Sequence, residues 1–167
     1  MGTTRQRLER IFRDLDKRIA EINFERRTEG LRLFSKTKVR LLGQTSLMAN
    51  DRISAMFSLA QTADLDAVLK MDDLLKNEFT KLLIREGLVY DEDSYLIWIP
   101  HGAKFERLFD FENVGVETID PESALVSKAV KAPEKNKQLI REAIASDEFP
   151  TLVDRILANG GKLENFA

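Results

Sequence analysis

Cysteine is absent from the 167 residues, and His101 is the only histidine. The lack of thiols excludes disulfides, thiolate metal sites and cysteine nucleophiles. A single histidine argues against a zinc enzyme, and any Ser-His triad would have to use His101. No apolar run approaches 18 residues, and no apolar segment follows Met1. We therefore expect a cytoplasmic protein that is neither exported nor inserted in a membrane.

Charge is distributed unevenly along the chain. Residues 1–40 hold 12 of the 26 Lys and Arg but 6 of the 28 Asp and Glu, a net charge of +6 against −8 for the remainder. A basic N-terminal helix could contact RNA or an acidic protein partner. Because acids are interleaved with these bases, the segment equally fits an ordinary solvated helix face.

The N-terminal segment, residues 1–35, reads as a helical arm on a domain of residues 36–167. Apolar residues recur there at helical spacing, which predicts one long helix with an apolar stripe. Its members are Leu8, Ile11, Phe12, Leu15, Ile19 and Ile22. The pattern could extend through Leu31 and Phe34, although Gly30 weakens it. The stripe either covers a face of a sheet or pairs with a second copy of the chain.

The stretch from Lys38 to Leu69 reads as strand, turn, helix and strand. Lys38–Leu42 is β-compatible and ends at the turn Gly43-Gln44-Thr45-Ser46, and a helical segment follows from Leu47 to Leu59 with a break at Asn50-Asp51. The second strand, residues 61–69, carries Asp64 and Asp66 at its head.

Side chains two residues apart in a strand leave the same face, so Asp64 and Asp66 should lie side by side. A hard divalent cation, Mg²⁺ or Mn²⁺, would relieve their repulsion and bind phosphate as well. Gly43 would let backbone N–H groups approach a ligand, and Thr45 and Ser46 add hydroxyl donors. The alternative is that an acidic pair at a strand start only decorates a turn or an edge strand.

The remaining elements complete a mixed sheet flanked by helices, an α/β (α+β) fold. A helix capped by Asp72 or Asp73 should run to about Arg85, and Gly87 should stop it. Leu88–Tyr90 and Tyr95–Ile99 read as a hairpin around residues 91–94. Val114–Ile119 is a strand, whereas Phe105–Phe111 is ambiguous. C-terminal helices are predicted at 121–131, 134–146 and 149–158, the first with Asp120 as N-cap and Pro121 at its first position.

Three segments of the C-terminal half carry a resemblance to a known family. They are Ile99-Pro100-His101-Gly102-Ala103-Lys104-Phe105-Glu106-Arg107-Leu108, Ile119-Asp120-Pro121-Glu122-Ser123-Ala124-Leu125-Val126-Ser127-Lys128 and Pro133-Glu134-Lys135-Asn136. With the order of elements around D-x-D, they resemble small bacterial nucleotidyltransferase-like proteins. Those proteins are related to the nucleotidyltransferases of toxin–antitoxin and abortive-infection systems. The resemblance covers roughly residues 36–145.

This resemblance implies a nucleotidyltransferase fold that transfers a nucleotidyl group from a nucleoside triphosphate to a hydroxyl on a protein or RNA. Asp64 and Asp66 match the catalytic and metal-binding D-x-D pair, which would bind Mg²⁺ or Mn²⁺. The turn Gly43, Gln44, Thr45 and Ser46 would hold the triphosphate, and Thr62 matches a threonine that precedes the pair. Lys128 matches a lysine that could face the phosphates, or it is a surface lysine.

The chain also departs from the family pattern. Gln44 stands where a small residue is usual, Ala60 replaces an arginine, and Asn136 replaces an aspartate. The third catalytic carboxylate is expected on Tyr95–Ile99, which contains none, and no spacing argument brings Glu106 or Asp110 to the pair. The alternative function is therefore a catalytically degenerate, antitoxin-like or regulatory module that binds a nucleotide or a protein partner.

Other residues have simpler interpretations. His101, between Pro100 and Gly102, fits a turn better than a general base. Trp98 fits the core better than a base-stacking platform. A cluster of lysines fits a solvated helix face, with phosphate or RNA contact as the alternative. Its members are Lys128, Lys131, Lys135 and Lys137.

Overall fold

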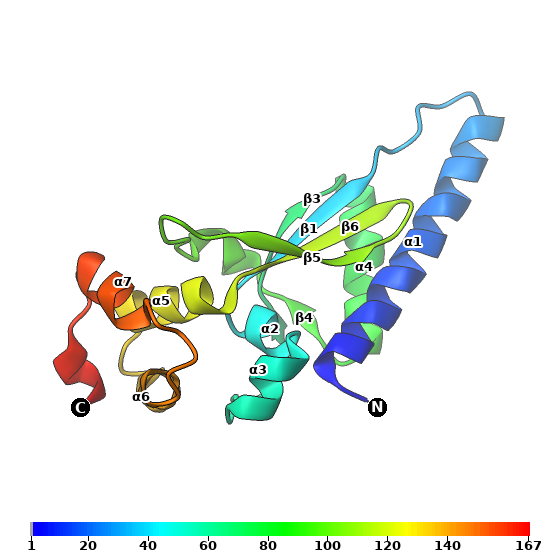
Figure 1. Ribbon diagram of the computed structural model, residues 1–167. Coiled ribbons are helices and arrows are strands. Elements are labelled where there is room, and N and C mark those ends of the chain that lie inside the picture. Colours follow the sequence, from blue (N-terminus) through cyan, green and yellow to red (C-terminus); the bar gives the residue numbers. More distant parts are fainter. Residues whose placement is uncertain (1) are drawn as a thin grey trace.

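A four-stranded mixed sheet packs against helices in the computed structural model, which describes residues 2–167 (Figure 1). Its strands are β1 (Thr37–Leu41), β3 (Ala67–Lys70), β5 (Phe105–Asp110) and β6 (Val114–Ile119), in the spatial order β3-β1-β6-β5. β1 and β6 are parallel, and the two outer pairs are antiparallel. The mixed α/β class predicted from the sequence is confirmed.

The helices follow the caps and apolar periods of the sequence. They are α1 (Thr4–Thr28), α2 (Gly43–Met48), α3 (Asp51–Met56), α4 (Asp73–Arg85), α5 (Pro121–Lys131), α6 (Lys137–Ala145) and α7 (Leu152–Ala158), with 3₁₀ turns η1 (Glu92–Leu96) and η2 (Leu163–Phe166). Asn50 separates α2 from α3, and its side chain accepts a hydrogen bond from Ile53 N. Among residues 2–167, none of the helices has the length and apolar character needed to cross a bilayer.

Helices α1 and α4 cover one face of the sheet. The whole apolar stripe of α1 is buried there against Val39, Leu41 and Val116. Phe12 lies at the centre, its ring centroid 5.4 Å from that of Phe79 and 6.3 Å from that of Phe109. The first of the two partners predicted for the stripe, a face of the sheet, is therefore the observed one.

The helix ends earlier than its longest predicted extent. α1 stops at Thr28, and Gly30 has φ +71°, a left-handed conformation that glycine adopts without strain. The extension through Leu31 and Phe34 is wrong, because the chain turns back at Gly30 towards β1.

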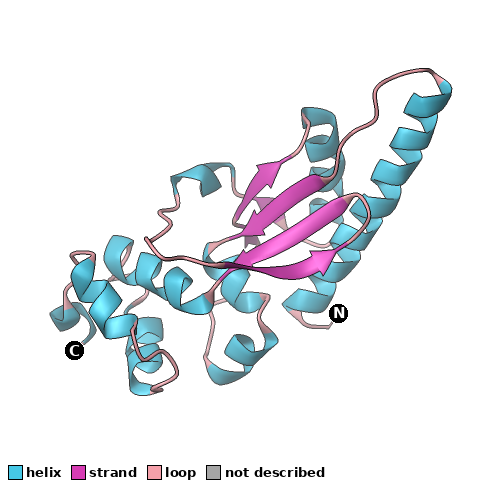
Figure 2. Cartoon of the chain, turned by 45° about the horizontal axis from the view of Figure 1, so that its top comes forward, coloured by secondary structure: helices cyan, strands magenta, loops and turns pink. Residues whose placement is uncertain are grey.

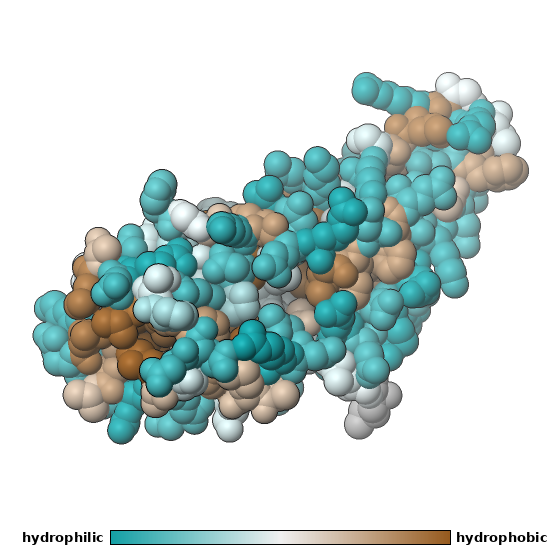
Figure 3. Space-filling model, in the orientation of Figure 1, coloured by the Kyte–Doolittle hydropathy of each residue, from teal (hydrophilic) through white to brown (hydrophobic). Residues whose placement is uncertain are grey.

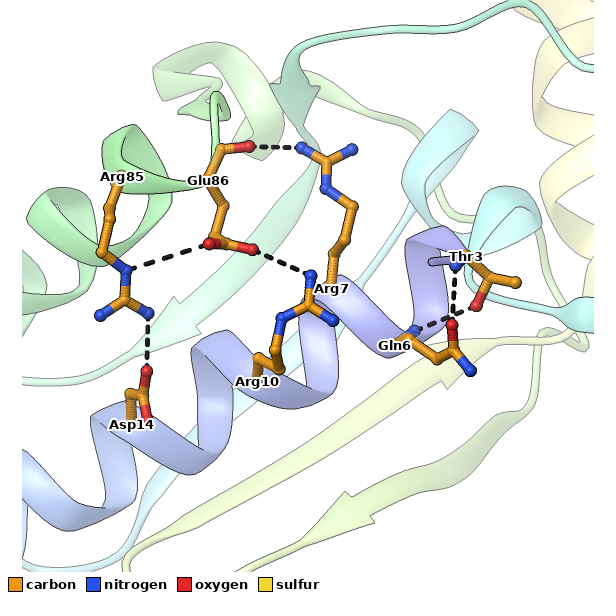
Figure 4. Close-up of polar contacts among 7 residues, drawn as sticks. All are labelled: Thr3, Gln6, Arg7, Arg10, Asp14, Arg85 and Glu86. Carbon is orange, nitrogen blue, oxygen red and sulfur yellow. Dashed lines mark hydrogen bonds and ion pairs between the residues drawn. The ribbon is translucent and has the colours of Figure 1, made fainter. Parts of the chain in front are cut away.

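Polar contacts fix the start of α1 against the end of α4 (Figure 4). Arg10 pairs with Glu86 at 3.2 Å, and Asp14 pairs with Arg85 at 2.6 Å. The guanidinium of Arg7 donates to the carbonyl of Glu86. Much of the positive charge in this half of α1 thus has acceptors within the protein.

A second core lies under the C-terminal helices, at the end of the molecule opposite α1 (Figure 1). α5 begins as predicted, with the Asp120 side chain accepting from Ser123 N at 3.0 Å and Pro121 in the first turn. α6 and α7 fall inside the predicted ranges. Hydrophobic surface gathers over this end, while much of the rest of the visible surface is hydrophilic (Figure 3).

Two predictions about the middle of the chain are wrong. The expected second strand breaks at Asp66 into β2 (Asp64–Leu65) and β3, and β2 pairs with β4 (Val89–Tyr90) in a separate parallel pair. Tyr95–Ile99 is no hairpin strand, because Asp91 caps the 3₁₀ turn η1 by accepting from Asp93 N. The ambiguous segment Phe105–Phe111 provides β5 and forms the actual hairpin with β6.

Candidate functional site

Asp66 lies at the break between β2 and β3, where backbone contacts hold it on both sides. Its N–H donates to Thr45 Oγ1 at 2.9 Å, and its carbonyl accepts from Leu42 N at 2.9 Å. The Thr45 hydroxyl in turn donates to Asp64 O at 3.3 Å. Thr45 is buried, and its hydroxyl holds the backbone of residues 64–66 in place through these two hydrogen bonds.

Asp91 is brought to Asp66 from a distant part of the sequence. Its N–H donates to Leu65 O at 3.0 Å, which continues the pairing of β4 with β2. Burial raises the pKa of Asp66 to about 6, and a hydrogen bond to Asp91 together with the negative charges of Asp91 and Asp64 adds to the rise. Two carboxyl groups therefore meet at this point and compete for a proton or a cation.

Lys128 on α5 contributes positive charge to the same place. Burial lowers its pKa, as does the charge of Lys135, whereas the carboxylate of Asp66 opposes the shift. Asp66 and Lys128 line one hollow of about 520 Å³. The lining side chains that carry a polar or charged group are Asp66, Asp91, Trp98, Ser127, Lys128, Lys131, Lys135 and Asn136.

Gly43 lies beside the Asp66 carboxylate in this hollow. Its φ is +51°, and a Cβ built on it would stand 2.8 Å from Asp66 Oδ2. No side chain fits there without displacing the carboxylate. The glycine that the sequence suggested for a phosphate approach thus makes room for Asp66 itself.

The other residues of the predicted turn form the first turn of α2 and face elsewhere. The Gln44 side chain donates to Ala60 O at 2.8 Å, and Ser46 Oγ donates to Gly43 O at 2.7 Å. Of the four turn residues in the described chain, Gly43 alone lines the hollow.

Asp64 occupies a different position from Asp66 because the strand breaks between them. It is exposed, its N–H donates to Thr62 Oγ1 at 3.1 Å, and it lines a small hollow near Thr4 and Arg7 of α1. Across residues 2–167, no group of three or more His, Asp or Glu side chains is arranged to hold a metal ion. The carboxyl partner of Asp66 in the hollow is Asp91.

Trp98 and Lys131 add a planar and a cationic group to the hollow. Lys131 Nζ lies 5.2 Å from the centroid of the Trp98 ring, and Ser127 Oγ donates to Trp98 O at 2.6 Å. Trp98 is half-buried. His101 is exposed and away from the hollow, and its carbonyl accepts from Arg155.

Sequence reasoning missed Asp91 as a site residue. The one available signal was that Asp91 directly follows the short apolar segment Leu88–Tyr90. Because residues 91–94 were assigned to a hairpin turn, this position did not indicate a site residue. Neither Glu106 nor Asp110, the other acids considered, lines the hollow. Both are on β5, and Asp110 pairs with Lys36 at 2.5 Å.

Comparisons with protein-family models, with curated proteins and with solved structures find no match.

Replacing Asp66 with asparagine should stabilise the cation-free protein near neutral pH. The raised pKa means that the folded state holds the proton more tightly than the unfolded state, so stability falls as pH rises from about 4 to about 6. Because solvent screens this partly exposed group, we expect Asp66→Asn to gain about 1–2 kcal/mol at pH 7.5 and little at pH 4.

Urea unfolding in EDTA at both pH values measures this difference. Glu112→Gln, at an exposed position with no ion pair among residues 2–167, is the matched control and should change little at either pH. Equal stability of Asp66→Asn and wild type at pH 7.5 would contradict a raised pKa of the Asp66 carboxyl in the folded protein.

Proposed function

We propose that the chain binds a nucleoside triphosphate with Mg²⁺ or Mn²⁺ in the hollow between Asp66 and α5, and transfers its nucleotidyl group to a hydroxyl. The observation that carries the proposal is that Asp66 and Asp91 line one hollow together with Lys128, Lys131 and Lys135. Carboxylate oxygens coordinate hard cations, and lysine ammonium groups bind phosphate oxygens. The hollow thus offers both halves of a metal–triphosphate site.

Asp66 and Asp91 fit the divalent cation better than Asp64 and Asp66 do. Both carboxyl groups line the hollow, and the pKa of Asp66 is raised first by burial and then by its interaction with Asp91. A bound cation would neutralise the phosphates and make an attacking hydroxyl more acidic. Asp64 adds negative charge to the site from the neighbouring hollow.

The lysines would hold the triphosphate tail, and Trp98 offers an apolar ring to a base. In the transfer, the acceptor oxygen forms a bond to the α-phosphorus while the bond to the β-phosphate oxygen breaks and pyrophosphate leaves. Lys128, Lys131 and Lys135 would stabilise the charge on pyrophosphate. A carboxylate oxygen of Asp66 that the cation leaves free would accept the hydroxyl proton.

Thermal unfolding with each of the four nucleoside triphosphates and Mg²⁺ or Mn²⁺ tests the binding step. A ligand at about 100 times its Kd stabilises a protein by about 2.7 kcal/mol, which corresponds to about 5–10 °C for a chain of this size. We expect such a shift with at least one nucleotide, dependent on the cation. Asp66→Asn/Asp91→Asn should lose it relative to its own unliganded baseline.

Asp93→Asn is the matched control, because Asp93 is an exposed neighbour of Asp91 outside the hollow, and it should keep the shift. Asp64→Asn measures separately what Asp64 contributes. If no nucleotide raises the unfolding temperature, or if the double variant keeps the full shift, the proposed site is wrong.

The separation of Asp64 from the hollow favours a second candidate, a module that binds the nucleotide without turnover. It can be distinguished by incubating the protein with an α-labelled nucleotide, the cation, and RNA and protein acceptors. Label transfer with pyrophosphate release, lost in Asp66→Asn/Asp91→Asn, supports the enzyme. Nucleotide-dependent stabilisation with no transfer supports the binding module.

A further inference from the structure

The sheet has a second face that no helix within residues 2–167 covers. Side chains alternate along a strand, so Val39 and Leu41 face the core while Lys38 and Arg40 face outward. Figure 2 shows the strands of the four-stranded sheet with no helix in front of them. We call this surface the open face, and it contains a hollow of about 280 Å³.

The open face carries more positive than negative charge. Its charged residues are Lys36, Lys38, Arg40, Lys70, Arg107, Asp110 and Glu117. Both acids are already paired, Glu117 with Arg40 at 3.0 Å and Asp110 with Lys36 and Arg107. Within residues 2–167, no ion pair joins Lys38 or Lys70 to a carboxylate.

Lys38 and Lys70 are also placed directly opposite each other. They are partners in the antiparallel register of β1 and β3, where like charges destabilise a sheet. Lysine on the outer strand β3 could simply block edge-to-edge association. That explanation does not extend to Lys38, because β1 is an inner strand. The pair is better explained by an anion that binds between the two ammonium groups.

The positive surface continues beyond this pair. An adjoining hollow of about 590 Å³ shares Lys36 and Lys70 with the open face and adds Arg26 and Arg32. Its one acid is Asp72, whose carboxylate accepts from Leu74 N at the start of α4. In the other direction, Asp66 immediately precedes β3, and its carbonyl accepts from Leu42 N beside the end of β1. Four residues of strand separate Lys70 from Asp66, roughly 13 Å. A long polyanion could therefore lie on this surface and reach the hollow at Asp66.

We propose that the open face, centred on Lys38 and Lys70, binds the phosphodiester backbone of a single-stranded RNA. A chain of evenly spaced phosphates complements a row of cations on a rigid strand better than an acidic protein surface does. The Arg40 guanidinium lies 4.3 Å from the centroid of Phe105 and offers a planar stack for a base. The carboxylates of Asp110 and Glu117 can accept hydrogen bonds from 2′-hydroxyls, which DNA lacks.

This inference goes beyond the proposed function, since strand binding needs neither the nucleotide nor the cation. It rests on that function only in placing the acceptor hydroxyl on the RNA. The two are tested separately, because nucleotide binding is measured at the Asp66 hollow and strand binding at Lys38 and Lys70.

Fluorescence anisotropy of a labelled RNA of about 16 nucleotides tests the surface, without nucleotide and in EDTA. Lys38→Glu/Lys70→Glu should weaken binding at least about tenfold at about 50 mM salt. The slope of log affinity against log salt should fall by about 1–2, because about two phosphate contacts are lost.

Lys17→Glu/Lys81→Glu is the control; both lysines are exposed, and Lys81 pairs with Glu78 at 3.8 Å. It changes the net charge by the same amount on α1 and α4, which cover the other face, and its affinity should stay within about threefold of wild type. Unfolding temperatures of both variants verify that they are folded.

Three results would overturn the proposal. The first is wild-type affinity in Lys38→Glu/Lys70→Glu, and the second is an equal loss in the control variant. The third is a preference of the wild type for a DNA strand of the same sequence or for a poly-glutamate peptide, which would assign the surface to a different occupant.

Discussion

Phe12→Ala is expected to cost about 3–5 kcal/mol of folding free energy, the largest loss from any single substitution considered for this protein. Phe12 is fully buried and packs against Phe79 of α4 and Phe109 of β5. Truncation to alanine removes the ring that joins α1, α4 and the sheet and leaves a cavity among them. Urea unfolding followed by circular dichroism measures the loss.

Phe24→Ala on the same helix is the matched control, because Phe24 is 67% exposed and should cost less than about 1 kcal/mol. If Phe12→Ala does not fold, Phe12→Leu keeps most of the apolar volume and gives a measurable intermediate loss. The wild-type midpoint should not change with protein concentration, since the stripe of α1 is buried within one chain. Equal effects at Phe12 and Phe24 would show that α1 is not part of the core.

Gly43→Ala is expected to cost about 2–4 kcal/mol and to remove the nucleotide-dependent stabilisation. Part of the cost, about 1–2 kcal/mol, is the left-handed backbone at φ +51°. The rest arises because the new methyl group would stand 2.8 Å from Asp66 Oδ2 and must displace that carboxylate. Unfolding experiments with and without nucleotide and cation measure both effects.

Gly30→Ala separates the two causes, because Gly30 has φ +71° and a Cβ built on it meets no other atom of residues 2–167 within 4 Å, its chain neighbours aside. It should show the backbone cost alone and keep nucleotide binding. In an Asp66→Ala background, the cost of Gly43→Ala should fall towards that of Gly30→Ala. An unchanged cost in that background would mean that Gly43 does not act through Asp66.

These predictions concern different parts of one arrangement. The Phe12 substitutions test whether α1 covers one face of the sheet, which leaves the other face open. The Gly43 and Asp66 substitutions test the carboxylates at the end of the open face. The Lys38 and Lys70 substitutions test the positive charge of the open face.

The elements whose signals are local could be predicted from the amino-acid sequence alone. The apolar stripe of α1 follows from the helical period, and α5 follows from Asp120 as N-cap with Pro121 after it. The strands β1 and β6 and the helix α4 lie close to their predicted positions for the same reason. Each of these signals acts within a few residues, so no knowledge of the rest of the chain is needed to interpret it.

The composition of the candidate site depends on how distant strands pair in the folded chain. Asp64 and Asp66 are two residues apart, yet β2 pairs with β4 and β3 pairs with β1, which separates them into different hollows. The same pairing of β2 with β4 brings Asp91 to Asp66 across 25 residues of sequence. Strand pairing depends on contacts between distant segments, and a spacing rule assumes an unbroken strand.

The open face was hidden in the sequence for a related reason. Lys38 and Lys70 become opposite partners only in the antiparallel register of β1 and β3, and they are left outward because α1 and α4 bury the other face. On the N-terminal helix, for which the sequence left open both an RNA or protein contact and an ordinary solvated face, Arg7 and Arg10 contact Glu86. Local patterns determine which side chains share a face of an element, whereas packing determines which face meets solvent.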